Sequence, residues 1–160
     1  MTLSDTRESV VFRKAAESDM EEVLRLQTEI FSGEQNIPAG DIAHFLERRP
    51  QCWIAVMDGA VVGAAAAWEE DGLTHWGRFV MKKECRGQSI GTRLAEFSFR
   101  ELFSQPVDEI YMEAREITRD LVCGMGGRVV GEPVAFYRGT ITPVVLRRED
   151  FLRQNARTFR

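Results

Sequence analysis

Two Asp-Gly pairs, Asp58-Gly59 and Asp71-Gly72, constrain the fold of this chain more than any other feature. Each pair separates runs rich in apolar, β-branched and aromatic residues, and in that setting Asp-Gly is the strongest short-range signal for a hairpin turn. The runs are Cys52–Met57, Ala60–Trp68 and Leu73–Met81. The sequence therefore predicts three antiparallel strands joined as a meander.

Around this meander, the hydrophobic spacing predicts a mixed α/β fold. A first strand precedes a helix that begins at the capping box Ser18–Glu21 and ends near Phe31, followed by a loop over Ser32–Gly40. The other predicted elements are a strand at Val10–Ala15, a short helix marked by Ile42, Phe45 and Leu46, a helix carrying Ile90, Leu94, Phe97 and Leu102, a strand at Ile110–Ala114, a helix at Thr118–Cys123, and a closing hairpin of Arg128–Phe136 and Ile141–Leu146. The predicted order is β-α-α-β-β-β-α-β-α-β-β.

Length and composition favour one soluble domain over residues 1–160, with a basic C-terminal tail over residues 147–160. The net charge of −4 gives no general attraction to nucleic acid, and no apolar run is long enough to cross a membrane. Three cysteines lie far apart, without the paired spacing of a disulfide framework or a zinc site. We therefore expect a cytoplasmic protein. The final hairpin and the tail are the segments through which two subunits could pair as a homodimer.

The segment Lys82–Leu94 has the composition of an anion site. It lies between a predicted strand and a predicted helix, where unpaired backbone N–H groups and the positive helix end meet. Gly87 and Gly91 would let an anion approach the backbone. Basic residues add positive charge to an otherwise acidic chain: Lys82, Lys83, Arg86 and Arg93. Neither a G-x-x-x-x-G-K-[ST] loop nor a G-x-G-x-x-G loop is present, so other phosphate loops are not indicated. The alternative is that the glycines only shape a turn and the basic side chains are solvated.

The run Arg86-Gly87-Gln88-Ser89-Ile90-Gly91 resembles the Q/R-x-x-G-x-G/A signature of the GNAT acetyltransferases. The element order resembles that family over nearly the whole chain. Two further stretches resemble its ElaA-like branch: residues 30–38, IFSGEQNIP, and the closing strand pair from Phe136 to Leu146.

This resemblance implies an N-acetyltransferase that uses acetyl-CoA and no metal. The fourth and fifth strands would splay, and the acyl-pantetheine arm would lie in the gap. The resemblance assigns the arm to the backbone of Phe79, Val80 and Met81, and the pyrophosphate to Arg86, Gly87, Gln88, Ser89, Ile90, Gly91 and Thr92. A deprotonated amine would then attack the thioester directly, and an amide near Val80 would stabilise the oxyanion. The expected acceptor is a primary amine of a small molecule.

Two positions depart from the family pattern. Ser89 stands where a glycine is usual; it keeps its amide and adds a hydroxyl. Val122 stands where many relatives carry a tyrosine that protonates the leaving thiolate, and valine cannot act as an acid. Cys123, Tyr137 or water are the replacements left open.

The candidates for the general base are Glu34 and His75. Glu34 lies in the loop expected over the acceptor site, and a solvated loop carboxylate is the alternative. His75 lies on the predicted fourth strand and, if unperturbed, would titrate near ~6.5; a surface or core histidine is the alternative. Trp68 and Trp76 are expected to oppose each other across the Asp71-Gly72 turn. Only His44 and His75 are present as histidines, without metal-ligand spacing, so no metal site is expected.

Three functions stay open on these residues. The first is acetylation of a small amine. The second is a sensor that binds acyl-CoA with little or no turnover, which Val122 favours. The third is an acyltransferase for longer acyl chains on the same fold.

Overall fold

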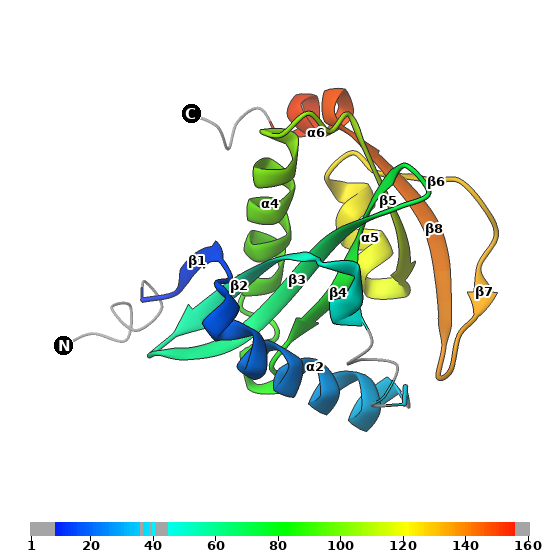
Figure 1. The fold of residues 1–160 in the computed structure, drawn as a ribbon. Helices are drawn as coiled ribbons and strands as arrows, with labels where there is room; N and C mark the ends of the chain where they lie inside the picture. The colour runs from blue at the N-terminus through cyan, green and yellow to red at the C-terminus, as the bar shows by residue number, and fades with distance from the viewer. Residues whose placement is uncertain (1–8, 36, 39, 41–44, 156–160) are drawn as a thin grey trace. The chain divides into compact units, whose positions relative to one another are not determined.

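The computed structural model describes residues 9–35, 37–38, 40 and 45–155 (Figure 1). The elements are β1 (Val11–Lys14), η1 (Glu17–Asp19), α2 (Met20–Gln35), η2 (Phe45–Arg48), β2 (Gln51–Met57), β3 (Ala60–Glu70), β4 (Leu73–Met81), η3 (Lys83–Cys85), α4 (Ile90–Phe103), β5 (Glu109–Arg115), α5 (Glu116–Gly124), β6 (Arg128–Val129), β7 (Val134–Ala135), β8 (Thr140–Arg147) and α6 (Arg148–Gln154). Hydrogen bonds join the strands in the order β1-β2-β3-β4-β5-β8-β6, and β7 pairs with β8. The predicted mixed α/β fold and element order are confirmed.

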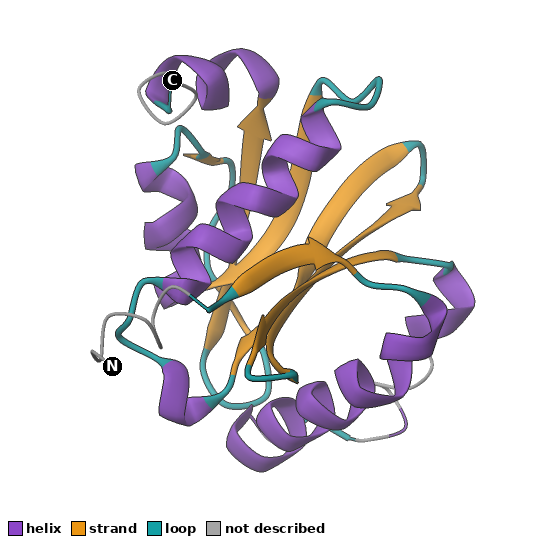
Figure 2. Ribbon diagram, turned by 90° about the vertical axis from the view of Figure 1, so that its left-hand side faces the viewer, coloured by secondary structure: helices purple, strands orange, loops and turns teal. Residues whose placement is uncertain are grey.

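The chain divides into two compact units, and the first consists of residues 1–66 and 78–99. Here β1 pairs antiparallel with β2, in the register Val11↔Val56 to Lys14↔Trp53. Helix α2 packs along the strands of this unit (Figures 1 and 2). The residues of this core share near-complete burial and come from α2, β2, β3 and β4: Val23, Leu26, Ile30, Phe31, Ile54, Val61, Ala64 and Val80. The apolar face predicted for the first helix forms one side of this core.

The predicted hairpin turns are both present, because Asp and Gly adopt the left-handed conformation that a two-residue turn requires. The φ angles are 51° and 79° at Asp58 and Gly59, and 54° and 77° at Asp71 and Gly72. At the second turn the hydroxyl of Thr74 donates to the carboxylate of Glu69, at 2.7 Å.

The expected pairing of Trp68 with Trp76 was wrong. The Trp68 ring instead stacks on His75, with centroids 5.8 Å apart. Because a two-residue turn places Glu69 opposite Thr74, the residue opposite Trp68 is His75, one position earlier than we expected. Trp76 is buried, at 2% exposure, on the other face of its strand.

The second unit consists of residues 67–77 and 100–160 and is built on β5 and β8. These strands pair antiparallel from Glu109↔Arg147 to Arg115↔Ile141, and α5 contacts both. Strand β5 also pairs in parallel with β4, at Thr74↔Ile110 and His75↔Tyr111. The register of this parallel pair ends after two residues, as expected for strands that splay.

The predicted closing hairpin is interrupted on one side. Two short strands, β6 and β7, replace the expected continuous strand, while β8 is continuous. β6 pairs with Val144 and Val145, and β7 pairs with Thr140 and Ile141. Pro143 lies between these two segments. Because proline has no N–H to donate, the partner strand is broken where a ladder bond would fall.

Three predicted boundaries need correction. The cap residue is Ala16 rather than Ser18: the carboxylate of Asp19 accepts the Ala16 N–H at 2.6 Å, and Ser18 lies inside η1, which leads into α2. Helix α2 continues to Gln35, so the first part of the expected loop is helical. The tail predicted from residue 147 begins with α6, which buries Phe151 completely.

Some predictions fall outside the described residues. These concern Asn36, Ile42 and His44, the first eight residues, and Arg157 and Arg160 of the tail. The predicted short second helix is described only over η2, which contains Phe45 and Leu46. In the described part of the chain, every helix is too short or too polar to cross a membrane.

Candidate coenzyme site at the β4–α4 junction

The segment predicted to bind phosphate forms a tight connection between β4 and α4. Strand β4 ends at Met81, η3 follows, and α4 begins at Ile90. The N–H of Arg93 donates to the carbonyl of Ser89 at 3.1 Å, which makes Ser89 the residue that precedes the helix. The amides of the first helical turn have no acceptor within a helix, so those of residues 90–92 lie at an end suited to an anion.

Two residues of this connection have left-handed backbones. The φ angle is 82° at Gly87 and 64° at Ser89. Glycine adopts such a conformation without strain, whereas a residue with a Cβ atom meets its neighbouring carbonyl. The loop therefore turns in the way a glycine at position 89 would allow, and Ser89 adopts this conformation at a cost in free energy.

Gly91 has a different role from the one we expected. A Cβ atom here would lie 3.1 Å from Cγ of Met81 and 3.3 Å from Cζ of Phe79. The missing side chain therefore allows the first turn of α4 to pack closely against β4. Gly87, by contrast, has open space around its Cβ position, so the sequence argument about backbone access fits Gly87 better than Gly91.

A hollow of about 370 Å³ and a second of about 270 Å³ lie in the first unit. The smaller one adjoins the loop and is lined by Val10, Gly87, Gln88, Ile90 and Arg93. The guanidinium of Arg93 lies 4.8 Å above the ring centroid of Phe12, which holds a positive charge at this hollow. Arg93 was counted among the basic residues of the segment but was absent from the predicted ligand set.

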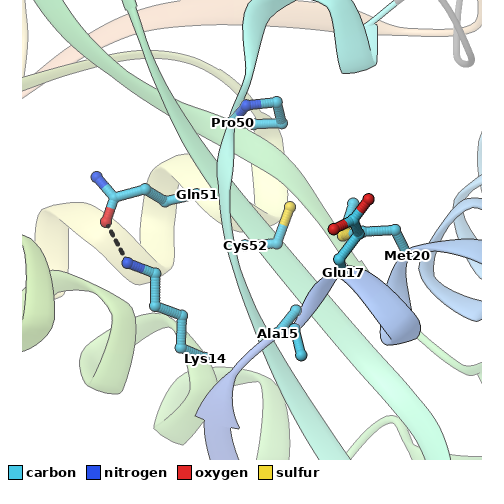
Figure 3. A pocket seen from close by; sticks show the side chains of 8 residues that line it. Lys14, Ala15, Glu17, Met20, Pro50, Gln51 and Cys52 are labelled. Atoms are coloured by element: carbon cyan, nitrogen blue, oxygen red, sulfur yellow. Dashed lines mark hydrogen bonds between the residues drawn. The ribbon is translucent and has the colours of Figure 1, made fainter.

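The larger hollow contains none of the predicted site residues (Figure 3). Its walls include Glu17, Met20 and Cys52, and on one side Lys14 donates to Gln51 at 2.9 Å. Burial raises the pKa of the Cys52 thiol to about 11, which keeps it protonated at neutral pH. A protonated, buried thiol is a poor nucleophile, so Cys52 does not supply a reactive group to this hollow.

Arg86, the first residue of the signature, is bound to two other parts of the first unit. Its Nε donates to the carbonyl of Met81 at 3.2 Å. Its Nη1 and Nη2 donate to the two carboxylate oxygens of Glu34, at 2.9 and 3.1 Å. The structure thus brings together a predicted phosphate ligand and a predicted general base.

Sequence reasoning missed Arg78, which lies on β4 just before Phe79. Its φ of 56° is unusual for a strand residue, and its carbonyl accepts a hydrogen bond from Gln27 of α2 at 3.2 Å. The guanidinium carbon lies 4.2 Å from the ring centroid of Phe45 and 5.5 Å from that of Phe31. Burial, more than any neighbouring charge, lowers the pKa of Arg78 to about 10. A charged residue between Gly77 and Phe79 in a predicted buried strand was the signal available in the sequence.

His75 belongs to an aromatic cluster in the second unit. Its ring lies between Trp68 and Tyr111, at 5.8 and 5.1 Å between centroids. Burial, with a contribution from Glu113, raises the pKa of Tyr111, so this phenol is neutral at physiological pH. The cluster makes His75 a packed cross-strand residue.

Val122, at the usual tyrosine position, and the two side chains that could replace the tyrosine, Cys123 and Tyr137, differ in their surroundings. Val122 is completely buried in α5, so this position contributes to packing. Burial is the largest cause that raises the pKa of the Cys123 thiol. Tyr137 is 52% exposed, with a φ of 49° and its ring edge-on to Phe136. Of the two side chains, Tyr137 is the more accessible to a ligand.

Within the described ranges, histidine, cysteine and carboxylate side chains do not gather in groups of three that could hold a metal ion. At the β4–α4 junction the groups that could bind a ligand are backbone amides, the ion pair of Arg86 with Glu34 and the N-terminus of α4.

Comparison with known proteins agrees with this geometry. Residues 19–125 match the acetyltransferase (GNAT) family. A protein of Methanocaldococcus jannaschii described as an uncharacterized N-acetyltransferase is 34% identical over 86 residues, which are 53% of this chain and 54% of that protein. The match therefore spans about half the length of that relative.

Solved structures show the same fold at low identity. Escherichia coli ElaA superposes with a TM-score of 0.75 and 18% identity, covering 85% of this chain and 98% of ElaA. An acyl-CoA N-acyltransferase from Pseudomonas aeruginosa superposes with a TM-score of 0.73 and 19% identity, covering 86% and 99%. Together, the family match and the relative from Methanocaldococcus jannaschii identify an N-acetyltransferase. The chain belongs to the acetyltransferase (GNAT) family, as its sequence predicted, and its fold is that of ElaA.

Proposed function

We propose that this protein transfers an acetyl group from acetyl-CoA to a primary amine of a small molecule. The observation that carries the proposal is the β4–α4 junction, where the left-handed Gly87 and Ser89 lead into the first turn of a 14-residue helix. The adjoining hollow and the cation of Arg93 support an anionic ligand at this point.

In this proposal the donor is bound mainly by backbone groups. The amides of residues 86–92 bind the diphosphate, and the backbone of Phe79, Val80 and Met81 pairs with the pantetheine arm as an added strand would. A strand–loop–helix unit fixes these groups before the donor arrives. Much of the rate enhancement then comes from positioning the two substrates.

The chemical step is a direct attack. The amine nitrogen of the acceptor bonds to the thioester carbonyl carbon, the C–S bond breaks, and coenzyme A leaves as the thiolate. Before the attack Glu34 accepts a proton from the acceptor's ammonium, directly or through water, and His75 is the second candidate base. An amide near Val80 donates to the developing oxyanion. As the amide forms, its nitrogen loses a second proton, which passes through Tyr137 or water to the thiolate and gives free coenzyme A.

A second candidate function is an acyl-CoA sensor with little or no turnover. The specific observation is Val122, which is completely buried where many family members carry the tyrosine acid. The two functions differ in one measurable quantity. An enzyme releases free thiol in the presence of some amine, whereas a sensor binds acyl-CoA and releases none with any amine.

Calorimetric titration of the purified protein with acetyl-CoA tests the proposal. Micromolar binding is expected, and the double variant Arg86→Ala, Ser89→Asp should lose it because it removes a cation and adds a carboxylate to the loop. Ser18→Asp, which adds the same charge in η1, is the matched control and should bind as the unaltered protein does. If the folded protein binds neither acetyl-CoA nor longer acyl-CoAs, the proposal is wrong.

We further propose that the whole chain acts as one cytoplasmic domain and pairs as a homodimer through its last hairpin. Exposed apolar side chains on and beside β6 and β7 support such a pairing: Val129 at 49%, Val130 at 56% and Val134 at 59%. Sedimentation equilibrium of the protein and of a Val130→Asp, Val134→Asp variant checks this. A monomeric unaltered protein would exclude the dimer.

A further inference from the structure

The ion pair between Glu34 and Arg86 suggests a role for both residues that the family signature does not contain. We propose that Glu34 and the diphosphate of the donor compete for the guanidinium of Arg86, so that donor binding releases Glu34 toward the acceptor. The inference rests on the proposed function, because it takes the diphosphate site to be the loop over residues 86–92.

One side of the Arg86 guanidinium is hydrogen-bonded to the backbone, and the other side faces an anion. Nε donates to the carbonyl of Met81, the last residue of β4, and this bond fixes the group beside the loop. Nη1 and Nη2 form a planar fork, and both arms donate to Glu34. The bond from Nε to Met81 can therefore stay in place whichever anion accepts from Nη1 and Nη2.

The fork fits either of two anions. Two parallel N–H groups match a carboxylate and a phosphate with nearly the same geometry. The carboxylate of Glu34 therefore stands where one non-bridging pair of phosphate oxygens would be bound. Because both arms already donate to Glu34, a diphosphate that takes the same edge must displace the carboxylate.

Helix α2 delivers Glu34 to this place. Near its start, Glu22 accepts the N–H of Val61 on β3 at 2.9 Å, and in its middle Gln27 donates to the carbonyl of Arg78 on β4. Glu34 lies one residue before the helix ends at Gln35. Hydrogen bonds therefore join the helix to the strands near its start and in its middle, and Arg86 binds it near its end, within the segment that was predicted as the acceptor loop.

The solvent exposure of the Arg86–Glu34 ion pair indicates which anion Arg86 prefers, the carboxylate or the diphosphate. The side chains of Arg86 and Glu34 are 41% and 39% exposed. Ion pairs with that much solvent access typically change an equilibrium by a factor of about 1.4 to 5. A diphosphate carries more charge than one carboxylate and is bound at the same time by loop amides, and charge-assisted bonds of this kind are roughly twice as strong as neutral ones. The diphosphate should therefore displace Glu34 from Nη1 and Nη2 of Arg86.

The exchange orders the reaction. Before the donor binds, the carboxylate of Glu34 is occupied by Arg86. After the donor binds, the two bonds from Arg86 no longer hold the carboxylate, and it can accept a proton from the ammonium of the acceptor. The amine then loses its proton only when a thioester is present to be attacked.

Calorimetric titration with acetyl-CoA across a double-mutant cycle tests this inference. Glu34→Gln should tighten acetyl-CoA binding by a factor of about 2 to 5, because the neutral amide competes less well for the fork. Arg86→Gln should weaken binding, and Glu34→Gln should have no effect in that background. Glu84→Gln, which removes the same charge from an exposed position of η3, is the matched control and should change the affinity by less than Glu34→Gln does.

The inference is overturned if Glu34→Gln binds acetyl-CoA as the unaltered protein does or more weakly. It is equally overturned if the tightening persists with Arg86→Gln or is matched by Glu84→Gln, since either result means a general charge effect. In all of these cases the unaltered protein still binds acetyl-CoA and the proposed function stands. Failure of the unaltered protein to bind overturns both.

Discussion

Ser89 offers the sharpest test of the loop geometry, through the substitution Ser89→Gly. Its φ of 64° lies in the left-handed region. A residue with a Cβ atom pays about 1 to 2 kcal/mol there, and glycine does not. Glycine also makes the unfolded chain more flexible, which costs roughly 0.4 to 1 kcal/mol. The difference predicts a net stabilisation of about 0.5 to 1 kcal/mol.

Thermal unfolding followed by circular dichroism measures this effect. For a chain of this length the expected rise in Tm is roughly 1 to 4 °C. Ser18→Gly is the matched control, because Ser18 is exposed and has no positive φ, so the same change should lower Tm there. If Ser89→Gly lowers Tm as much as Ser18→Gly does, position 89 is not strained, and the account of the loop given above fails.

Three other substitutions test separate parts of the structure by the same unfolding assay. Gly91→Ala should lower the free energy of unfolding by about 1 kcal/mol, because the added Cβ would press on Met81 and Phe79. The control is Gly33→Ala in α2, which has open space around it and should raise the free energy of unfolding by about 0.5 to 1 kcal/mol. Equal effects of the two substitutions would contradict the close approach of α4 to β4. Asp19→Asn should cost about 1 kcal/mol at pH 7, because the carboxylate accepts the Ala16 N–H and pairs with Arg13. Since these bonds, led by that with Arg13, lower the pKa of Asp19 to about 2, the stabilisation is present above about pH 4 and is lost as pH falls through 2, where variant and unaltered protein should unfold alike. Phe151→Ala should lower the free energy of unfolding by about 3 to 5 kcal/mol, because Phe151 is completely buried. Leu152, which is 43% exposed, is the control, and Leu152→Ala should lower it by less than about 0.5 kcal/mol. A small effect of Phe151→Ala would mean that α6 is a dispensable tail.

Local chemistry made the meander and the loop predictable. An Asp-Gly pair turns the chain within two residues, so both hairpins followed from adjacent positions. The loop between β4 and α4 could be located for the same reason, since Gly87 and the start of α4 are encoded by neighbouring residues. These features need no knowledge of the rest of the fold.

Contacts between distant segments were out of reach. Arg86 and Glu34 are 52 positions apart, and nothing at either residue indicates the other. The register error at Trp68 had another cause: the opposing residues depend on the exact count in the turn, and a shift of one residue puts a side chain on the other face. The predicted cap at Ser18 was wrong because Asp19, and not Glu21, reaches back to a backbone N–H, that of Ala16. The bond from Arg13 to Asp19, visible only in the fold, holds the carboxylate in that position.

Backbone strain at Ser89 bears on function as well as on folding. A left-handed residue with a Cβ atom persists only when the surrounding structure imposes its conformation, and such residues gather at sites that need a particular backbone geometry. Here the imposed angle is the one at which the chain turns from the loop into the first turn of α4. Glycine at this position would reach the same angle at lower cost, so the geometry is maintained by the fold and not by the residue's own preference. The donor site that we propose binds through backbone amides, so it depends on where the N–H groups point. In that proposal the signature can lose a glycine and keep the site, provided that this angle is retained.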